Sequence, residues 1–148
     1  MLFAGYAVLR RRWAWLVAGG LAVAVADPLC ARVLKPAVGR ERPCRALAGV
    51  EAPNGCGAAQ SMPSVHAANT AALAAATGSP VLMGVAALTG ASRVVTGVHW
   101  PSDVIVGWIV GGVVGGAVGT GVGVATRAAM RRLRRRRGRE TPEEPPWT

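Results

Sequence analysis

The sequence is poor in aromatic and acidic residues. Its 148 residues include one Tyr, one Phe and five Trp, and only seven Asp and Glu stand against seventeen Lys and Arg. Its hydrophobicity comes instead from small aliphatic residues, and twenty glycines accompany them. Small residues let helices approach one another closely, which is how helices associate in lipid. The length suggests a single domain.

Residues with metal-ligand spacing are also scarce. The three cysteines form no CxxC pair, which argues against a zinc site, and Glu41 and Glu51 are too isolated to make a magnesium site. We therefore expect no metal and no cofactor. Cys44 and Cys56 fall in one polar stretch, where a disulfide would contribute about 3 kcal/mol, but the sequence leaves their pairing open. Cys30 lies in an apolar run and is expected to be buried.

Long apolar runs, in contrast, are abundant. Four of them are expected to form helices, at about residues 13–34, 63–77, 80–95 and 104–125. The first and fourth reach the length of about 20 residues that a membrane crossing needs, whereas the middle two are shorter. Gly78 and Ser79 precede Pro80 and predict a tight turn, so the middle two should form an antiparallel hairpin. We expect an all-α integral membrane bundle of about four transmembrane helices.

Glycine recurs at every fourth position of the fourth run, from Gly107 to Gly123, and Gly112 and Gly116 stand beside this stripe. In lipid such a stripe forms a smooth ridge for close helix packing. The glycines are therefore assigned a structural role and no chemistry.

Positive charge is concentrated in two places, at Arg10–Arg12 and in eight arginines within residues 127–139. Such a run could bind nucleic acid, but beside apolar helices it is better explained as a cytoplasmic anchor, so no nucleic-acid partner is expected. No small-residue cleavage site follows the first apolar run, so no cleavable signal peptide is expected. Residues 1–126 would form a membrane domain and residues 127–148 a disordered cytoplasmic tail. Four crossings of the inner (cytoplasmic) membrane then put residues 35–62 and 92–103 on its outer side.

Three polar motifs fall on this expected outer face: KPAVGRERP, PSVH and SRVVTGVHWPSD. Their candidate site residues are Lys35, Arg42, Ser64, His66, Arg93, His99 and Asp103. The three cations would repel one another unless they shared a multiply charged anion, and arginine matches phosphate with bidentate hydrogen bonds. Ser64 opens a helix, whose N-terminus favours anions.

The histidines suggest a reaction at that anion. His99 and Asp103 are four residues apart and can meet where a helix begins. A carboxylate on one ring nitrogen fixes the tautomer and leaves the other nitrogen free to attack, while His66 is placed to act as a general acid. Any one motif alone is more simply read as an interfacial histidine or a topology signal. The three together, in order and on one face, are specific.

The triple KxxxxxxRP, PSxH and SRxxxxxHxxxD resembles the signature of the type 2 phosphatidic acid phosphatase (lipid phosphate phosphatase) superfamily, over about residues 13–126. The resemblance implies an all-helical, metal-free hydrolase. It assigns phosphate binding to Lys35, Arg42, Ser64 and Arg93, nucleophilic attack to His99, orientation of His99 to Asp103, and protonation of the leaving oxygen to His66. Val65 stands where the family often has Gly, and its backbone N–H remains for phosphate.

The resemblance also implies a substrate class, a lipid phosphate at the membrane surface. Undecaprenyl diphosphate is the first choice, with phosphatidylglycerol phosphate or phosphatidic acid as the alternative. Membrane members usually have six helices, so this chain is either a minimal four-helix form or lacks two N-terminal helices. A truncated, inactive homologue is therefore a further alternative. Vanadium haloperoxidases share the motifs but are larger and soluble.

Overall fold

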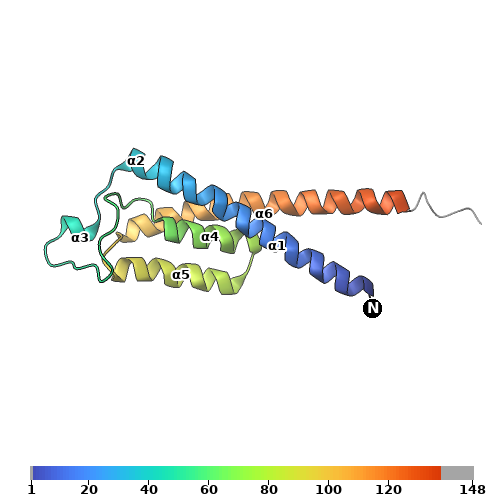
Figure 1. Ribbon diagram of the computed structural model, residues 1–148, viewed down its shortest axis with the longest axis horizontal. Coiled ribbons are helices and arrows are strands. Elements are labelled where there is room, and N and C mark those ends of the chain that lie inside the picture. Colours follow the sequence, from blue (N-terminus) through green and yellow to red (C-terminus); the bar gives the residue numbers. More distant parts are fainter. Residues whose placement is uncertain (1, 138–148) are drawn as a thin grey trace, which may run out of the picture.

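A computed structural model shows an all-α protein and describes residues 2–137, with side chains over residues 13–135. Its elements are α1 (Leu2–Pro28), the π-helical η1 (Leu29–Leu34), α2 (Lys35–Val38), α3 (Pro43–Ala46), α4 (Val65–Thr77), α5 (Pro80–Val95) and α6 (Pro101–Arg137) (Figure 1). The described part has no β-strand, only an isolated bridge between Glu41 and Gln60.

The first apolar run is longer than the sequence predicted. Helical backbone continues from Leu2 through η1 to Val38 and ends at Gly39, whose φ of 64° is left-handed. Pro28 has no N–H to donate, and the wider π-helical turn follows it directly. Lys35, expected in the polar loop, therefore lies on a helix. This corrects the loop boundary, because the loop begins only after Val38.

The predicted hairpin of α4 and α5 is confirmed. Ser64 caps α4 by accepting from the N–H of Ala67 at 3.5 Å, and Ser79 caps α5 by accepting from Leu82 at 3.4 Å. Between the two helices, Gly78 adopts the left-handed conformation with φ of 64°. Serine at a helix start and glycine just past a helix end are the residues that these positions favour.

Helix α6 extends beyond the fourth apolar run at both ends. It begins at Pro101, where a missing N–H costs nothing, and continues to Arg137. Arginine is a good helix former, and neither glycine nor proline interrupts the chain between Gly123 and Gly138. The first part of the expected tail, residues 127–137, is therefore helical. Its remainder, residues 138–148, lies outside the described residues.

The glycine ridge of α6 packs against the backbone of α4. The contacting glycines are Gly107, Gly111, Gly115 and Gly119, and a Cβ added to each would overlap a carbonyl oxygen, of Ser64, Ala68, Ala72 and Ala76 in turn. The prediction of a close-packing ridge is thus confirmed for these four positions. It is wrong for Gly112, Gly116 and Gly123, where a Cβ would have no neighbour within 4 Å. Alanines continue the close packing on the α1 side, where Ala22 and Ala26 are fully buried with Ala72.

Two helical stretches are long and apolar enough to cross a membrane, Trp13–Val38 and Pro101–Arg135, and α5 is a shorter apolar helix. Helix α4 is enclosed by α1, α5 and α6. Figure 1 shows the start of α1 and the end of α6 at one end of the bundle, and α3 with its flanking loops at the other. The basic clusters and the polar motifs therefore occupy opposite ends.

Candidate active site

The loop between α2 and α4 is tied down by covalent and polar links. Cys44 and Cys56 form a disulfide, with their Cα atoms 6.0 Å apart, which answers the question that the sequence left open. The N–H of Cys44 also donates to the carbonyl of Gly97 at 3.1 Å. This joins the loop to the turn that precedes His99, so two of the three polar motifs are fixed to each other. The remaining cysteine, Cys30, is buried as predicted.

His99 lies in the turn between α5 and α6 and is only 3% exposed. Its N–H donates to the carbonyl of Arg93 at 3.2 Å, which orients the turn. On the ring, Nδ1 lies 3.5 Å from Oδ2 of Asp103, and Nε2 lies 3.4 Å from Nη1 of Arg42. A guanidinium can only donate, so Nε2 carries the lone pair and Nδ1 the proton. We assign this tautomer, in which the unprotonated nitrogen points toward the cation and away from the carboxylate.

Burial also keeps His99 uncharged. The pKa of His99 is lowered to about 4, mainly by desolvation and then by the positive charges of Arg42 and Lys35, which Asp103 only partly offsets. The imidazole is therefore neutral near pH 7, and its Nε2 lone pair is available for bonding.

This electrostatic state can be measured directly, because the chain contains only two histidines. In a His66→Gln variant, NMR of isotope-labelled histidine should show one imidazole, protonated on Nδ1, that titrates well below the usual value of about 6.5. In the unfolded chain this imidazole takes up its proton at a higher pH than in the folded protein. His99 should therefore lower the free energy of unfolding as pH falls from about 6.5 to about 4, and it should contribute no such change above about pH 6.5. A midpoint at or above the usual value would contradict the assignment.

Asp103 is fully buried at the first turn of α6. Its Oδ2 accepts from the Ser61 hydroxyl and from the Trp100 N–H, both at 2.8 Å, and its Oδ1 accepts from Nη1 of Arg40 at 3.2 Å. A buried carboxylate needs such donors to remain charged. Nδ1 of His99, at 3.5 Å, makes no hydrogen bond within the described chain. Three donors thus fix the carboxylate next to the imidazole.

Two of these donors, Arg40 and Ser61, were missed from the sequence. Arg40 also donates to the Ser102 hydroxyl at 2.6 Å, and its guanidinium carbon lies 5.1 Å from the centre of the Trp100 ring. The one available signal was indirect: a carboxylate expected at a helix start beside an imidazole requires a cation, and Arg40 is one of two arginines in KPAVGRERP. The spacing alone does not tell Arg40 from Arg42.

Arg42 points toward His99 instead. Its Nε donates to the carbonyl of Ala58 at 2.6 Å, and its Nη1 donates to the carbonyl of Val98 at 2.9 Å. These bonds to the loop on one side and the turn on the other hold the guanidinium beside Nε2 of the imidazole. Arg42, expected from the sequence to bind phosphate, therefore lies in direct contact with the proposed attacking atom.

Lys35 precedes the loop and Ser64 follows it, and hydrogen bonds hold both residues in place. Nζ of Lys35, on a side chain that is nearly buried, donates to the carbonyls of Gln60 at 2.8 Å and Ser61 at 3.4 Å. The N–H of Ser64 donates to the carbonyl of Asp103 at 2.9 Å. This bond fixes the start of α4 to the start of α6, so the helix N-terminus predicted to hold an anion lies next to the histidine–carboxylate pair.

His66 and Arg93 complete the set. His66 is an exposed residue in the first turn of α4, and Arg93 lies in the last turn of α5 with its Nε donating to the Ser92 hydroxyl at 3.3 Å. The charges of Arg93, Lys35 and Arg42 all act on the His66 ring. The structure thus gathers all seven predicted residues at one end of the bundle. His99 has Asp103 and Arg42 as its direct neighbours.

The arrangement suits an anion that can accept a bond from nitrogen. It combines a neutral imidazole, a carboxylate behind it, the cations Arg42 and Lys35 near it, and Arg93 near His66. Within residues 13–135 no group of three or more His, Cys, Asp or Glu side chains is placed to hold a metal ion.

Comparison with known proteins places these residues in a family. Residues 13–127 match the PAP2 superfamily. The chain is also similar to decaprenylphosphoryl-5-phosphoribose phosphatases from two strains of Mycobacterium tuberculosis, with 40% identity over 112 residues. The match covers 72% of this chain and 60% of each relative, so the chain spans about three fifths of their length. No solved structure matches it. Since the family match covers most of the chain and includes all three polar motifs, the chain belongs to the PAP2 superfamily.

Proposed function

We propose that the protein is a membrane phosphatase that hydrolyses the terminal phosphate of a polyprenyl-linked lipid. The observation that carries this proposal is the buried, neutral His99 held between Asp103 and Arg42. Family membership supports the reaction class, and the curated relatives, named for a decaprenyl-linked phosphosugar, support the lipid.

The reaction would proceed in two steps. Nε2 of His99 attacks phosphorus, the bond to the leaving oxygen breaks, and His66 gives that oxygen a proton. Asp103 stabilises the positive charge that the phosphorylated ring acquires on the Nδ1 side. His66, now a base, then takes a proton from water as the water attacks phosphorus and frees His99.

The cations supply electrostatic stabilisation. Because Nη1 of Arg42 is 3.4 Å from Nε2, a phosphoryl group on that nitrogen would lie beside the guanidinium. Lys35, Arg93 and the N-terminus of α4 at Ser64 would neutralise the other oxygens.

Two substrates fit this proposal. Undecaprenyl diphosphate, the choice from the sequence, would release polyprenyl phosphate, whereas a polyprenylphosphoryl phosphosugar would release a sugar hydroxyl. A panel of both, with phosphatidylglycerol phosphate and phosphatidic acid, separates them through the release of inorganic phosphate. The proposal requires that a polyprenyl substrate be preferred and that vanadate, which resembles phosphate, inhibit the reaction. A purified protein that is folded but releases phosphate from none of the panel would support the inactive-homologue alternative.

Activity should survive excess EDTA. Asp103 already accepts from Ser61, Trp100 and Arg40, and among the described residues no three His, Cys, Asp or Glu side chains are grouped to hold a magnesium ion. The measurement compares phosphate release before and after chelation, with a known magnesium-dependent phosphatase as the control. Loss of activity that added Mg²⁺ restores would mean that the site chemistry had been misassigned.

Arg40 is expected to act as a positioning residue, through Asp103. Arg40→Gln removes the charge opposite a buried carboxylate and should lower kcat about tenfold to a hundredfold with little change in KM, because the hydrogen bonds of Arg40 go to Asp103 and Ser102. Arg40→Lys should recover part of the loss. In the same variant the NMR titration of His99 should shift, which a purely structural role would not produce. A rise in KM at unchanged kcat would instead make Arg40 a substrate ligand.

The site should face away from the cytoplasm. Ten arginines of α1 and α6 lie at the opposite end of the bundle, and moving them across a bilayer is unfavourable. In a Cys30→Ala background, a membrane-impermeant thiol reagent should label Ala52→Cys in intact cells stripped of outer barriers. Thr141→Cys, beyond the described residues, should stay unlabelled. The reverse pattern would put the site on the cytoplasmic side.

A further inference from the structure

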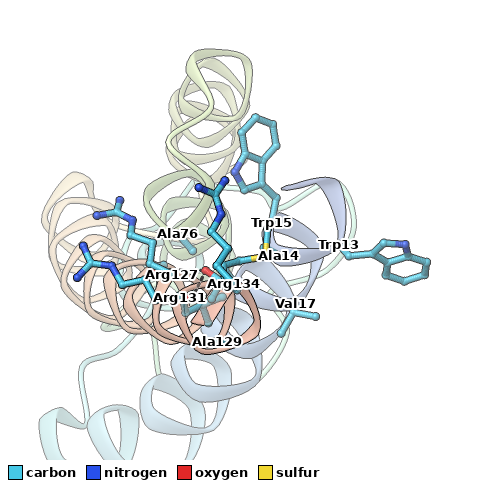
Figure 2. A pocket seen from close by; sticks show the side chains of 15 residues that line it. Trp13, Ala14, Trp15, Val17, Ala76, Arg127, Ala129, Arg131 and Arg134 are labelled. Carbon is cyan, nitrogen blue, oxygen red and sulfur yellow. Dashed lines mark hydrogen bonds between the residues drawn. The ribbon is translucent and has the colours of Figure 1, made fainter. Parts of the chain in front are cut away.

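A groove of about 880 Å³ is lined mainly by α1 and α6 (Figure 2). It lies near the start of α1 and the end of α6, at the end of the bundle away from the site loops (Figure 1). Its apolar wall includes Val17 and Ala18 from α1 and Val122 from α6. This groove takes no part in the proposed reaction, because none of the seven candidate site residues lines it.

The rim of the groove is basic. Arg127, Arg131 and Arg134 line it from successive turns of one α6 face, and Figure 2 shows their guanidinium groups extending from that helix. No acidic residue lines it within the described chain. Arg131 and Arg134 are exposed, so their charges are available to a partner.

The distance between the groove and the active site matches the thickness of a membrane. Along α6, Arg127 lies about 36 Å from Asp103, and along α1 and α2, Trp13 lies about 33 Å from Lys35, at about 1.5 Å per residue. A hydrocarbon core is about 30 Å thick. With the active site at one interface, the arginines and the tryptophans both reach the headgroup layer of the opposite leaflet, where tryptophan is enriched.

We infer that this groove binds an anionic phospholipid of the cytoplasmic leaflet. The phosphodiester would accept hydrogen bonds from Arg131 and Arg134, and the acyl chains would lie along Val17, Ala18 and Val122. An anionic lipid complements both the apolar wall and the basic rim of the groove. A free anion would leave the apolar wall uncovered, and a neutral lipid would leave the arginines unpaired. The inference needs the chain to be embedded in a membrane but not to be an active phosphatase.

The test compares two double variants of the full chain in a zwitterionic detergent. Arg131→Gln with Arg134→Gln removes two charges from the groove. The control, Arg132→Gln with Arg135→Gln, removes two charges from the same turns of α6, at exposed positions that do not line the groove. Native mass spectrometry measures the affinity for phosphatidylglycerol, with phosphatidylcholine as the reference lipid.

The groove variant should bind phosphatidylglycerol about 30-fold more weakly, since each arginine near a membrane surface contributes about a factor of five. The control variant should change by about twofold or less. An equal loss in both variants would mean that general positive charge attracts the lipid, and it would overturn the assignment of the groove. Phosphatidylcholine, whose choline offsets the charge of its phosphodiester, should lose much less affinity in the groove variant than phosphatidylglycerol does.

A further variant tests whether the acyl chains occupy the apolar part of the groove. A Cβ at Gly123 has no neighbour within 4 Å, and Gly123 lines the groove, so Gly123→Leu should fill it without disturbing helix packing. We expect weaker phosphatidylglycerol binding with all arginines in place, and a melting temperature at or above the wild-type value in the absence of that lipid. Soluble glycerol phosphate should compete poorly with the lipid in the wild type. Undiminished lipid binding in Gly123→Leu, or full competition by glycerol phosphate, would show that the acyl chains do not occupy the groove.

Discussion

Replacing His99 with alanine should reduce phosphate release by roughly a thousandfold or more, the scale seen when a catalytic nucleophile is removed. The loss follows from geometry, because Nε2 of His99 is the atom that Arg42 faces and Asp103 supports from behind. The rate is measured on purified protein with the preferred lipid of the panel. Circular dichroism and a melting curve check that the variant is folded, which matters because His99 is buried.

His66→Ala provides the matched control for this result. Because His66 is proposed to be the general acid, His66→Ala should lower the rate of phosphate release about 10²- to 10⁴-fold for a lipid substrate with a poor leaving group. With an aryl phosphate, whose leaving group needs no proton, the loss should be much smaller. His99→Ala should be inactive on both substrates. A His99 variant that keeps near-wild-type activity on either one would refute the role of His99 as nucleophile.

A methyl group at Gly111 should strongly destabilise the bundle. A Cβ there would overlap the carbonyl oxygen of Ala68, a backbone atom that cannot move aside without separating α4 from α6. Overpacking of this kind costs about 1–3 kcal/mol, and the upper end is expected here because the clash is with backbone. Gly111→Ala should therefore melt well below the wild type in the same detergent and lose activity, since α4 and α6 carry Ser64 and Asp103.

The neighbouring glycine gives a control one residue away. At Gly112 a Cβ would have no neighbour within 4 Å, and alanine is favoured over glycine inside a helix by about 1 kcal/mol. Gly112→Ala should thus melt at or above the wild-type temperature. Equal melting temperatures for the two variants would show that the α4–α6 contact is looser than the structure describes.

The helices were predictable because their signals are local. Ser79, Gly78 and the apolar run 80–95 mark a cap, a turn and a helix within a few residues, and the structure follows them. The ends of α1 and α6 were not predictable from hydropathy, because basic residues can continue a helix after the apolar run has stopped. Arg127 and Arg131 thus belong to α6.

In the active site, too, local contacts could be predicted from the sequence and long-range contacts could not. The pairing of His99 with Asp103 could be predicted, since four residues at a helix start bring two side chains together. The contacts of Arg40 and Ser61 with Asp103 could not, because they span 63 and 42 residues of sequence and depend on the path of the loop. Which arginine of KPAVGRERP faces the carboxylate and which faces the imidazole is a property of the folded loop, closed by Cys44 and Cys56.

The central claim, phosphoryl transfer to His99, can be tested by trapping the intermediate. Wild-type protein is mixed with substrate and quenched within one turnover under alkaline conditions, which preserve phosphohistidine, and its peptides are examined by mass spectrometry. We predict a phosphoryl group on His99, absent from His99→Ala and blocked by vanadate. With an aryl phosphate it should accumulate in His66→Ala, because water would attack without its base. A phosphoryl group on His66, or rapid turnover with no phosphohistidine at position 99, would contradict the account.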